Sequence, residues 1–299
     1  MNHAEMIAKM EGGDGFIAAL DQSGGSTPKA LGGYGVEEGS WSNDEDMFGL
    51  IHQMRERIIT APSFGSGKVI GAILFERTMD GKVGGKPTPQ ALIDKGIVPF
   101  LKIDKGLEEE ADGVQMMKPM PVLIDLLTRA RDLGVFGTKQ RSVINLANPD
   151  GIGAIVEQQF NVARQVLAQG LVPIIEPEVS LKSPERDAAD RILLNAILLQ
   201  LESIPNGQRV MLKLTIPVEP DLFRPLIDHP KVLRVVALSG GFSRVEACRE
   251  LARNPGMIAS FSRALLADLR KQQSDEEFDR TLGTAIDEIY EASTGKVAA

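Results

Sequence analysis

The chain has 299 residues, 43% of them hydrophobic and 25% charged, which is the composition of an ordinary globular protein. Its formal net charge of −8 at pH 7 argues against nucleic acid as a partner, because phosphate backbones are bound by basic surfaces. No apolar run approaches a membrane span, and the first residues lack the apolar stretch of a signal peptide. The single cysteine, Cys248, cannot form an internal disulfide. We therefore expect a cytoplasmic protein that binds no membrane.

Short β-branched runs alternate with longer amphipathic segments, a pattern typical of βα units around a parallel sheet. The predicted strands cover residues 16–21, 69–75, 98–104, 136–146, 172–179, 210–216, 232–239 and 257–263. The alternative is a doubly wound sheet, but no GxGxxG phosphate turn follows the first strand. We predict an α/β fold, a single (β/α)8 TIM-barrel domain over residues 1–299. A glycine-rich loop at 24–45 and an acidic C-terminal helix with a polar tail at about 274–299 complete it.

Ionisable side chains recur toward the C-terminal ends of the predicted strands, where functional residues of such barrels project. In chain order they are Asp21, Lys102, Asp104, Lys139, Arg141, Glu176, Glu178, Lys213 and Arg263. Four of these groups, on the third to sixth strands, follow one another at equal spacing, which matches the length of one βα unit. Charges inside a strand are costly unless they are paired. The set therefore indicates a functional site rather than a purely structural network.

Metal chemistry accounts poorly for these residues. The three histidines lie far apart in the sequence, none at the C-terminal end of a predicted strand, and with one cysteine they cannot form a zinc site. A magnesium site built from Asp21, Glu176 and Glu178 is an alternative, but it leaves the clustered lysines without a role. We therefore expect no metal and no other cofactor.

A lysine nucleophile accounts for the set better. An amine attacks a carbonyl only when it is neutral, and neighbouring cations and desolvation favour that form. Lys213 meets both conditions, because its strand is apolar and the neighbouring strands carry other lysines. The resulting iminium withdraws electrons and weakens an adjacent C–C bond. Glu176 or Glu178 can supply the general acid for dehydration, and Asp21 can supply the base for cleavage.

Two glycine-rich turns are candidate anion sites. Residues 239–241 (Ser-Gly-Gly) precede a predicted helix, and Arg263 follows on the next strand, as in the common phosphate site of such barrels. Residues 24–26 (Gly-Gly-Ser) suggest a second anion site, although a flexible loop explains them equally well. A polyanionic substrate of an acidic protein needs a focused basic site. Its predicted members are Lys102, Lys139, Arg141, Lys213 and Arg263.

Eight segments, in order along almost the whole chain, resemble those of class I fructose-bisphosphate aldolases, and most closely the short bacterial branch. The segments are ALDQSGGSTPKAL (19–31), GAILFERTMDGK (71–82), VPFLKIDKG (98–106), FGTKQR (136–141), GLVPIIEPEV (170–179), VMLKLTIP (210–217), VALSGGFS (236–243) and IASFSRAL (258–265). The resemblance implies a lyase of glycolysis and gluconeogenesis. Its reaction would be the reversible cleavage of fructose 1,6-bisphosphate to dihydroxyacetone phosphate and glyceraldehyde 3-phosphate.

The resemblance also implies roles for individual residues. Lys213 would form the Schiff base, and Glu176 would accept and donate the protons of its formation. Asp21 would handle the hydroxyl proton during cleavage, and Lys139 would stabilise charge next to Glu178 and the carbinolamine. The implied phosphate ligands are Ser239, Gly240 and Arg263 for the dihydroxyacetone half, and Lys102, Ser23 and Ser26 for the other half.

Two departures from the family pattern stand out. Larger members carry a phosphate-binding arginine shortly after the glycines of the first strand, where this chain has Ala30 beside Lys29. The long-chain branch ends in a tyrosine that assists proton transfer, whereas the last tyrosine here is Tyr290. Two other interpretations stay open. Another Schiff-base barrel, transaldolase-like or deoxyribose-phosphate aldolase-like, would have one anion site instead of two. A catalytically dead barrel would serve as a binding protein.

Overall fold

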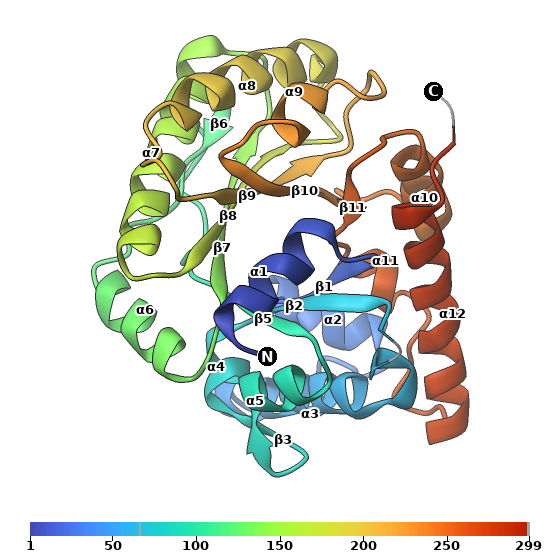
Figure 1. Cartoon of the computed structure of the whole chain (residues 1–299). Helices are drawn as coiled ribbons and strands as arrows, with labels where there is room; N and C mark the ends of the chain where they lie inside the picture. The colour runs from blue at the N-terminus through green and yellow to red at the C-terminus, as the bar shows by residue number, and fades with distance from the viewer. Residues whose placement is uncertain (66, 298–299) are drawn as a thin grey trace.

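The computed structural model describes residues 1–65 and 67–297, and it confirms the predicted barrel. Its parallel strands pair side by side in the order β1-β2-β5-β7-β8-β9-β10-β11 (Figure 1). They are β1 (Phe16–Leu20), β2 (Val69–Leu74), β5 (Val98–Lys102), β7 (Gly137–Ile144), β8 (Val172–Val179), β9 (Val210–Thr215), β10 (Val232–Leu238) and β11 (Ile258–Ala259). Between β11 and β1 the ring closes through the Ala19 N–H, which donates to the Phe261 carbonyl at 3.1 Å.

Helices follow most strands, and three short strands, β3, β4 and β6, lie outside the ring of parallel strands. The helices are α1 (His3–Gly12), α2 (Ser26–Gly33), α3 (Asp44–Thr60), α4 (Glu76–Asp80), α5 (Thr88–Asp94), α6 (Leu123–Asp132), α7 (Pro149–Ala168), α8 (Arg186–Leu201), α9 (Arg224–Ile227), α10 (Arg244–Ala252), α11 (Arg263–Leu266) and α12 (Asp275–Thr294), with a 3-10 turn at Pro62–Gly65. A hairpin joins β3 (Lys82–Val83) to β4 (Lys86–Pro87), and β6 (Val114–Gln115) runs antiparallel to β7. None of the described helices is long and apolar enough to span a membrane.

Two predicted segments differ from the structure. The segment predicted as a loop at 24–45 contains α2, whose Thr27 and Leu31 are buried. The last strand, predicted at 257–263, is only two residues long, and Arg263 lies instead in the first turn of α11. The acidic C-terminal helix is confirmed as α12, which begins with a capping box of Ser274 and Glu277. The last two residues of the predicted polar tail lie outside the described residues.

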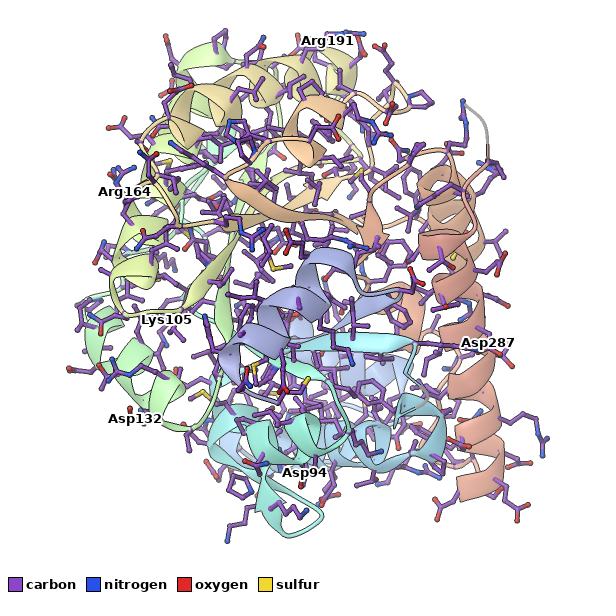
Figure 2. All side chains as sticks on the ribbon, viewed as in Figure 1. Asp94, Lys105, Asp132, Arg164, Arg191 and Asp287 are labelled. Atoms are coloured by element: carbon purple, nitrogen blue, oxygen red, sulfur yellow. The ribbon has the colours of Figure 1, made fainter. Side chains whose placement is uncertain are left out.

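The apolar core has two parts, which decide where a site can form. One fills the lower barrel with inward-facing side chains such as Ile17, Phe100 and Met211, and Met6 and Met10 of α1 pack onto it. Figure 1 shows α1 lying across this N-terminal end of the barrel. The other lies between the strands and the outer helices, and charged side chains of these helices such as Asp94, Arg164 and Arg191 point away from it (Figure 2). Because α1 covers the N-terminal end, a substrate must enter from the C-terminal ends of the strands.

Candidate active site

Strand alternation places the central charges inside the barrel. On β9, Met211 joins the inner core while Leu212 and Leu214 join the outer one, so Lys213 points inward above Met211. On β8, Ile174 belongs to the inner core in the same way, and Glu176 lies above it. Lys102 of β5 and Lys139 of β7 are register partners. The four equally spaced residues therefore lie on four successive strands, as the spacing predicts.

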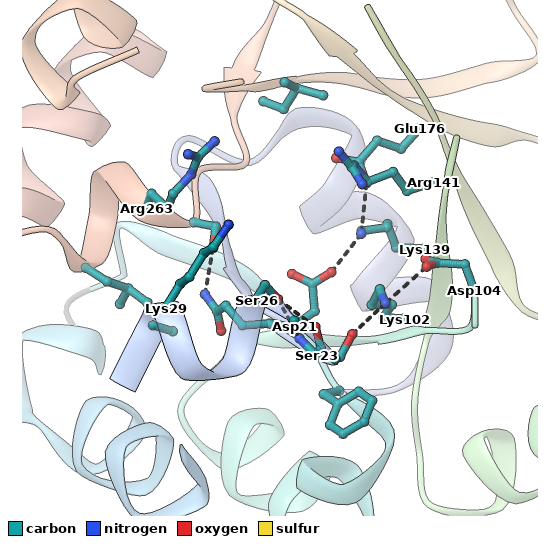
Figure 3. Close-up of a pocket in the computed structure, with 18 of the residues that line it drawn as sticks. Asp21, Ser23, Ser26, Lys29, Lys102, Asp104, Lys139, Arg141, Glu176 and Arg263 are labelled. Carbon is teal, nitrogen blue, oxygen red and sulfur yellow. Dashed lines mark hydrogen bonds and ion pairs between the residues drawn. The ribbon is translucent and has the colours of Figure 1, made fainter. Parts of the chain in front are cut away.

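Glu176 lies between two lysines. Lys213 Nζ is 3.1 Å from Glu176 Oε1, and Lys139 Nζ is 2.8 Å from Glu176 Oε2. Lys139 Nζ also contacts Asp21 Oδ2 at 2.7 Å, so a single ammonium joins both carboxylates (Figure 3). All four side chains are at most 10% exposed. These contacts bring the predicted base, the predicted acid and the predicted nucleophile within one buried network.

Burial and pairing oppose each other in this network, and the pKa directions show that pairing prevails. Burial alone would raise the pKa of Asp21, but Lys139, Lys213 and Lys102 hold it far below its usual range. The pKa of Glu176 is lowered for the same reason, since Lys139, Lys213 and Arg141 outweigh its desolvation. Burial would lower the pKa of Lys139, yet Asp21 and Glu176 raise it well above the ordinary value. Both carboxyl groups are therefore ionised, and Lys139 is a cation.

The expected pairing of Lys139 with Glu178 is wrong. Glu178 accepts from Arg141 Nε at 2.6 Å, whereas Lys139 pairs with Asp21 and Glu176. The reason is height in the barrel, because Glu178 lies two residues beyond Glu176 on β8 and so belongs to the next layer of inward-facing side chains. Between the two glutamates left open by the sequence, only Glu176 contacts Lys213 among the described ion pairs.

A second polar cluster forms the wall beside β5 and the β1 loop. Lys102 Nζ donates to Ser23 Oγ at 2.7 Å and lies 3.0 Å from Asp104 Oδ1. Ser26 Oγ closes the β1 turn by donating to the Ser23 carbonyl and accepting from the Ser23 N–H. Asp104 belongs to the strand-end charges predicted from the sequence, but no role was assigned to it there; its position two residues after Lys102 placed it on the same face.

The third cluster surrounds the turn after β10. Gly240 and Gly241 adopt φ values of +60° and +129°, which strongly favour glycine, and a Cβ added at Gly241 would lie 3.7 Å from Arg263 Nη2. The Gly241 N–H already donates to the Ser239 carbonyl at 2.7 Å, so it is less available to an anion than predicted. Lys29 of α2 also lines this part, and Figure 3 shows its amine pointing toward Arg263. The sequence indicates Lys29 because it stands next to Ala30, the position where larger family members carry a phosphate-binding arginine.

All three clusters border one cavity of about 1080 Å³ at the C-terminal ends of the strands. Every predicted site residue lines it: Asp21, Ser23, Ser26, Lys102, Lys139, Arg141, Glu176, Glu178, Lys213, Ser239, Gly240 and Arg263. Within residues 1–65 and 67–297, no group of three histidine, cysteine or acidic side chains is arranged to hold a metal ion. The cavity has room for a phosphorylated sugar, and its charged groups are lysines, arginines and the carboxylates that pair with them.

Comparison with known proteins identifies the family. The family model described as fructose-bisphosphate aldolase class-I, glycolytic, matches residues 2–187, more than half of the chain. A solved structure of fructose-bisphosphate aldolase from Plasmodium falciparum, in complex with TRAP and a small-molecule inhibitor, superposes with a TM-score of 0.79. That alignment covers 99% of this chain and 96% of the other at 21% identity, and so supports the fold. The chain therefore belongs to the class I fructose-bisphosphate aldolases, metal-independent lyases that cleave fructose 1,6-bisphosphate through a lysine Schiff base.

Proposed function

We propose that this enzyme forms its Schiff base on Lys213 and that Glu176 serves as the general acid and base of that step. The observation that carries the proposal is the position of the Glu176 carboxylate, 3.1 Å from Lys213 Nζ. Lys139 is a poorer nucleophile, because two carboxylates contact its amine and raise its pKa. Lys102 is turned toward Ser23 and Asp104, away from this pair.

The reaction follows from these positions. The Lys213 amine, once neutral, attacks the C2 carbonyl of the open-chain sugar and forms a carbinolamine. Glu176, having taken up a proton, gives it to the C2 hydroxyl, which leaves as water and produces the iminium. Asp21, kept ionised by its lysine neighbours, accepts the C4 hydroxyl proton while the C3–C4 bond breaks. The released aldehyde is glyceraldehyde 3-phosphate. Protonation of the enamine at C3 and hydrolysis of the imine then release dihydroxyacetone phosphate.

Two basic clusters support a substrate with a phosphate at each end. Arg263 and the turn at 239–240 would hold the phosphate of the dihydroxyacetone half, and Lys102 with the β1 turn would hold the other phosphate. Figure 3 has Arg263 and Lys102 on opposite sides of Asp21. Arg141 is paired with Glu178, and we assign it to the upper wall of the cavity. Phosphorylated sugars rather than nucleic acids are the proposed partners, and the glycolytic family favours a cytoplasmic location.

Reduction with borohydride in the presence of dihydroxyacetone phosphate tests the nucleophile. Mass spectrometry of the treated protein should find one reduced triose phosphate, attached to Lys213. Lys213→Met should take up no label. The matched control is Lys139→Met, which removes the neighbouring lysine and should still be labelled at Lys213, although more slowly. Labelling of Lys139 or Lys102 in the wild-type enzyme, or labelling of Lys213→Met, would contradict the assignment.

A further inference from the structure

Arg55 of α3 is a buried cation that no part of the mechanism above uses. It is 0% exposed and the largest fully buried side chain among the described residues. No carboxylate lies within 4.0 Å of it among the ion pairs of residues 1–65 and 67–297. Burial lowers the pKa of its guanidinium to about 10, with the charge of Asp21 opposing that shift. A buried charge without an ionic partner is costly, which calls for an explanation of its position.

The guanidinium is bound to the loop that follows β1. Its Nη1 donates to Thr78 Oγ1 at 2.7 Å, which fixes the plane of the group. Its Nη2 donates to the Gln22 carbonyl at 2.6 Å and reaches the Gln22 side-chain Oε1 at 3.3 Å. Gln22 lies between Asp21 and Ser23, so both neighbours along the chain are members of the candidate active site. Arg55 therefore restrains the backbone from which they project.

Gln22 carries this connection across the seam of the barrel. Its Nε2 donates to Ser262 Oγ at 2.6 Å and to the Ala19 carbonyl at 3.2 Å. Ser262 immediately precedes Arg263, the proposed ligand of one phosphate. The seam between β1 and β11 is otherwise thinly bonded, since a single backbone hydrogen bond, from Ala19 to Phe261, joins the two strand regions in the described chain. The contacts Arg55–Gln22–Ser262 thus connect α3, the β1 loop and the turn before α11.

We propose that Arg55 is a positioning residue for C–C bond cleavage, which holds the β1 loop so that Asp21 faces the C4 hydroxyl. The inference rests on the proposed function for the role of Asp21. It predicts an unequal effect on the two halves of the reaction. Schiff-base formation depends on Lys213 and Glu176, which Arg55 does not touch, whereas cleavage depends on Asp21, which lies next to the bound loop. A small displacement of a reacting group can cost about 10² in rate.

Arg234 offers a matched control. It is partly buried and donates to backbone carbonyls, those of Glu11 at 2.6 Å and Gly13 at 3.3 Å, and burial lowers the pKa of its guanidinium. Neither acceptor lies at the active site, because both belong to the segment that covers the N-terminal end of the barrel. Arg55→Met and Arg234→Met therefore remove similar groups from opposite ends of the barrel. Both variants should lose stability, Arg55→Met the more because Arg55 is fully buried, while only Arg55→Met should alter catalysis.

The test compares wild type, Arg55→Met, Arg55→Lys and Arg234→Met in three measurements: stability to urea, kcat and KM for cleavage of fructose 1,6-bisphosphate, and the rate of borohydride trapping with dihydroxyacetone phosphate. We expect Arg55→Met to lower kcat about 10²-fold while the trapping rate stays close to that of the wild type. Arg55→Lys should recover only part of kcat. Its single amine keeps the charge but cannot donate to both Thr78 and Gln22 as the guanidinium does. Arg234→Met should keep the wild-type kcat.

Equal kcat for Arg55→Met and Arg234→Met, or a parallel fall of cleavage and trapping in Arg55→Met, would overturn the inference. If Arg55→Met does not fold, Arg55→Lys makes the comparison, since it keeps the buried charge but cannot donate to both Thr78 and Gln22 as the guanidinium does. It should lower kcat for cleavage about tenfold and leave trapping unchanged. Failure of the proposed function has a different signature, because wild-type Lys213 would then not be trapped at all.

Discussion

Replacing Glu176 by glutamine keeps the shape of the side chain and removes its ability to exchange a proton. In the wild-type structure the carboxylate contacts Lys213 at 3.1 Å and Lys139 at 2.8 Å. The amide cannot protonate the C2 hydroxyl as it leaves the carbinolamine, and losing a general acid typically costs about 10²–10⁴ in rate. Binding of the ketose phosphate should persist, because Arg263 and the turn at 239–240 are not bonded to Glu176 in the described structure. We therefore expect Glu176→Gln to bind substrate and to form the imine about 10²–10⁴ times more slowly.

Single-turnover trapping measures this step directly, with borohydride stopping the reaction at successive times after mixing with dihydroxyacetone phosphate. Glu178→Gln is the matched control, since Glu178 lies two residues along the same strand and pairs with Arg141. It removes the same charge from the same wall without touching either lysine, so imine formation should be affected far less. If Glu178→Gln proved the more damaging change in this assay, the roles of the two glutamates would have to be exchanged.

Three further predictions concern charge. Folding lowers the pKa of Asp21, so its ionised form stabilises the protein above pH about 4 and that stabilisation is lost as the pH falls. The free energy of unfolding should therefore fall less between pH about 5 and 3 in Asp21→Asn than in the wild type, as urea denaturation would measure. Arg263→Ala should lower kcat/KM equally for fructose 1,6-bisphosphate and for a C1-monophosphate ketose. Lys102→Ala should lower kcat/KM mainly for the bisphosphate. If both variants lost the same kcat/KM for both substrates, the enzyme would have one phosphate site. Lys29→Met should raise KM for both substrates by about tenfold, because its amine points toward the proposed Arg263 phosphate site; an unchanged KM would exclude that contact.

The barrel and the centre of its site could be predicted because both depend on simple periodicities. Alternation along β9 puts Lys213 on the same face as Met211, and the equal spacing of the lysines and Glu176 follows from the length of a βα unit. Pairing between side chains was less predictable. The partner of Glu178 depends on how far Arg141 reaches along the next strand, which residue spacing alone does not determine. Likewise α2 formed where the glycines of the β1 loop predicted none.

Arg55 was missed for a different reason. Its helix reads Met-Arg-Glu-Arg at positions 54–57, and a run of charges usually marks a solvated face. The helical period nevertheless distinguishes the two arginines, because Arg55 follows Ile51 by four residues and precedes Ile58 by three, and both isoleucines are buried. Arg57 falls on another face and pairs with the exposed Asp275. A charged residue in phase with an apolar stripe was therefore the signal of a buried cation.

Charge balance inside the cavity explains how an acidic protein can accept a bisphosphate. Most cations near the cavity floor are already matched: Lys139 by two carboxylates, Lys102 by Asp104 and Arg141 by Glu178. Among the described ion pairs, no carboxylate partner is found for three others at or beneath the cavity, namely Lys29, Arg55 and Arg263. The uncompensated positive charge therefore lies toward the Arg263 side and under the β1 loop, although the whole chain carries −8. Lys139, matched by the two carboxylates, can serve proton transfer. Lys29 and Arg263, which line the cavity and lack such a partner among the described ion pairs, can attract and orient phosphate.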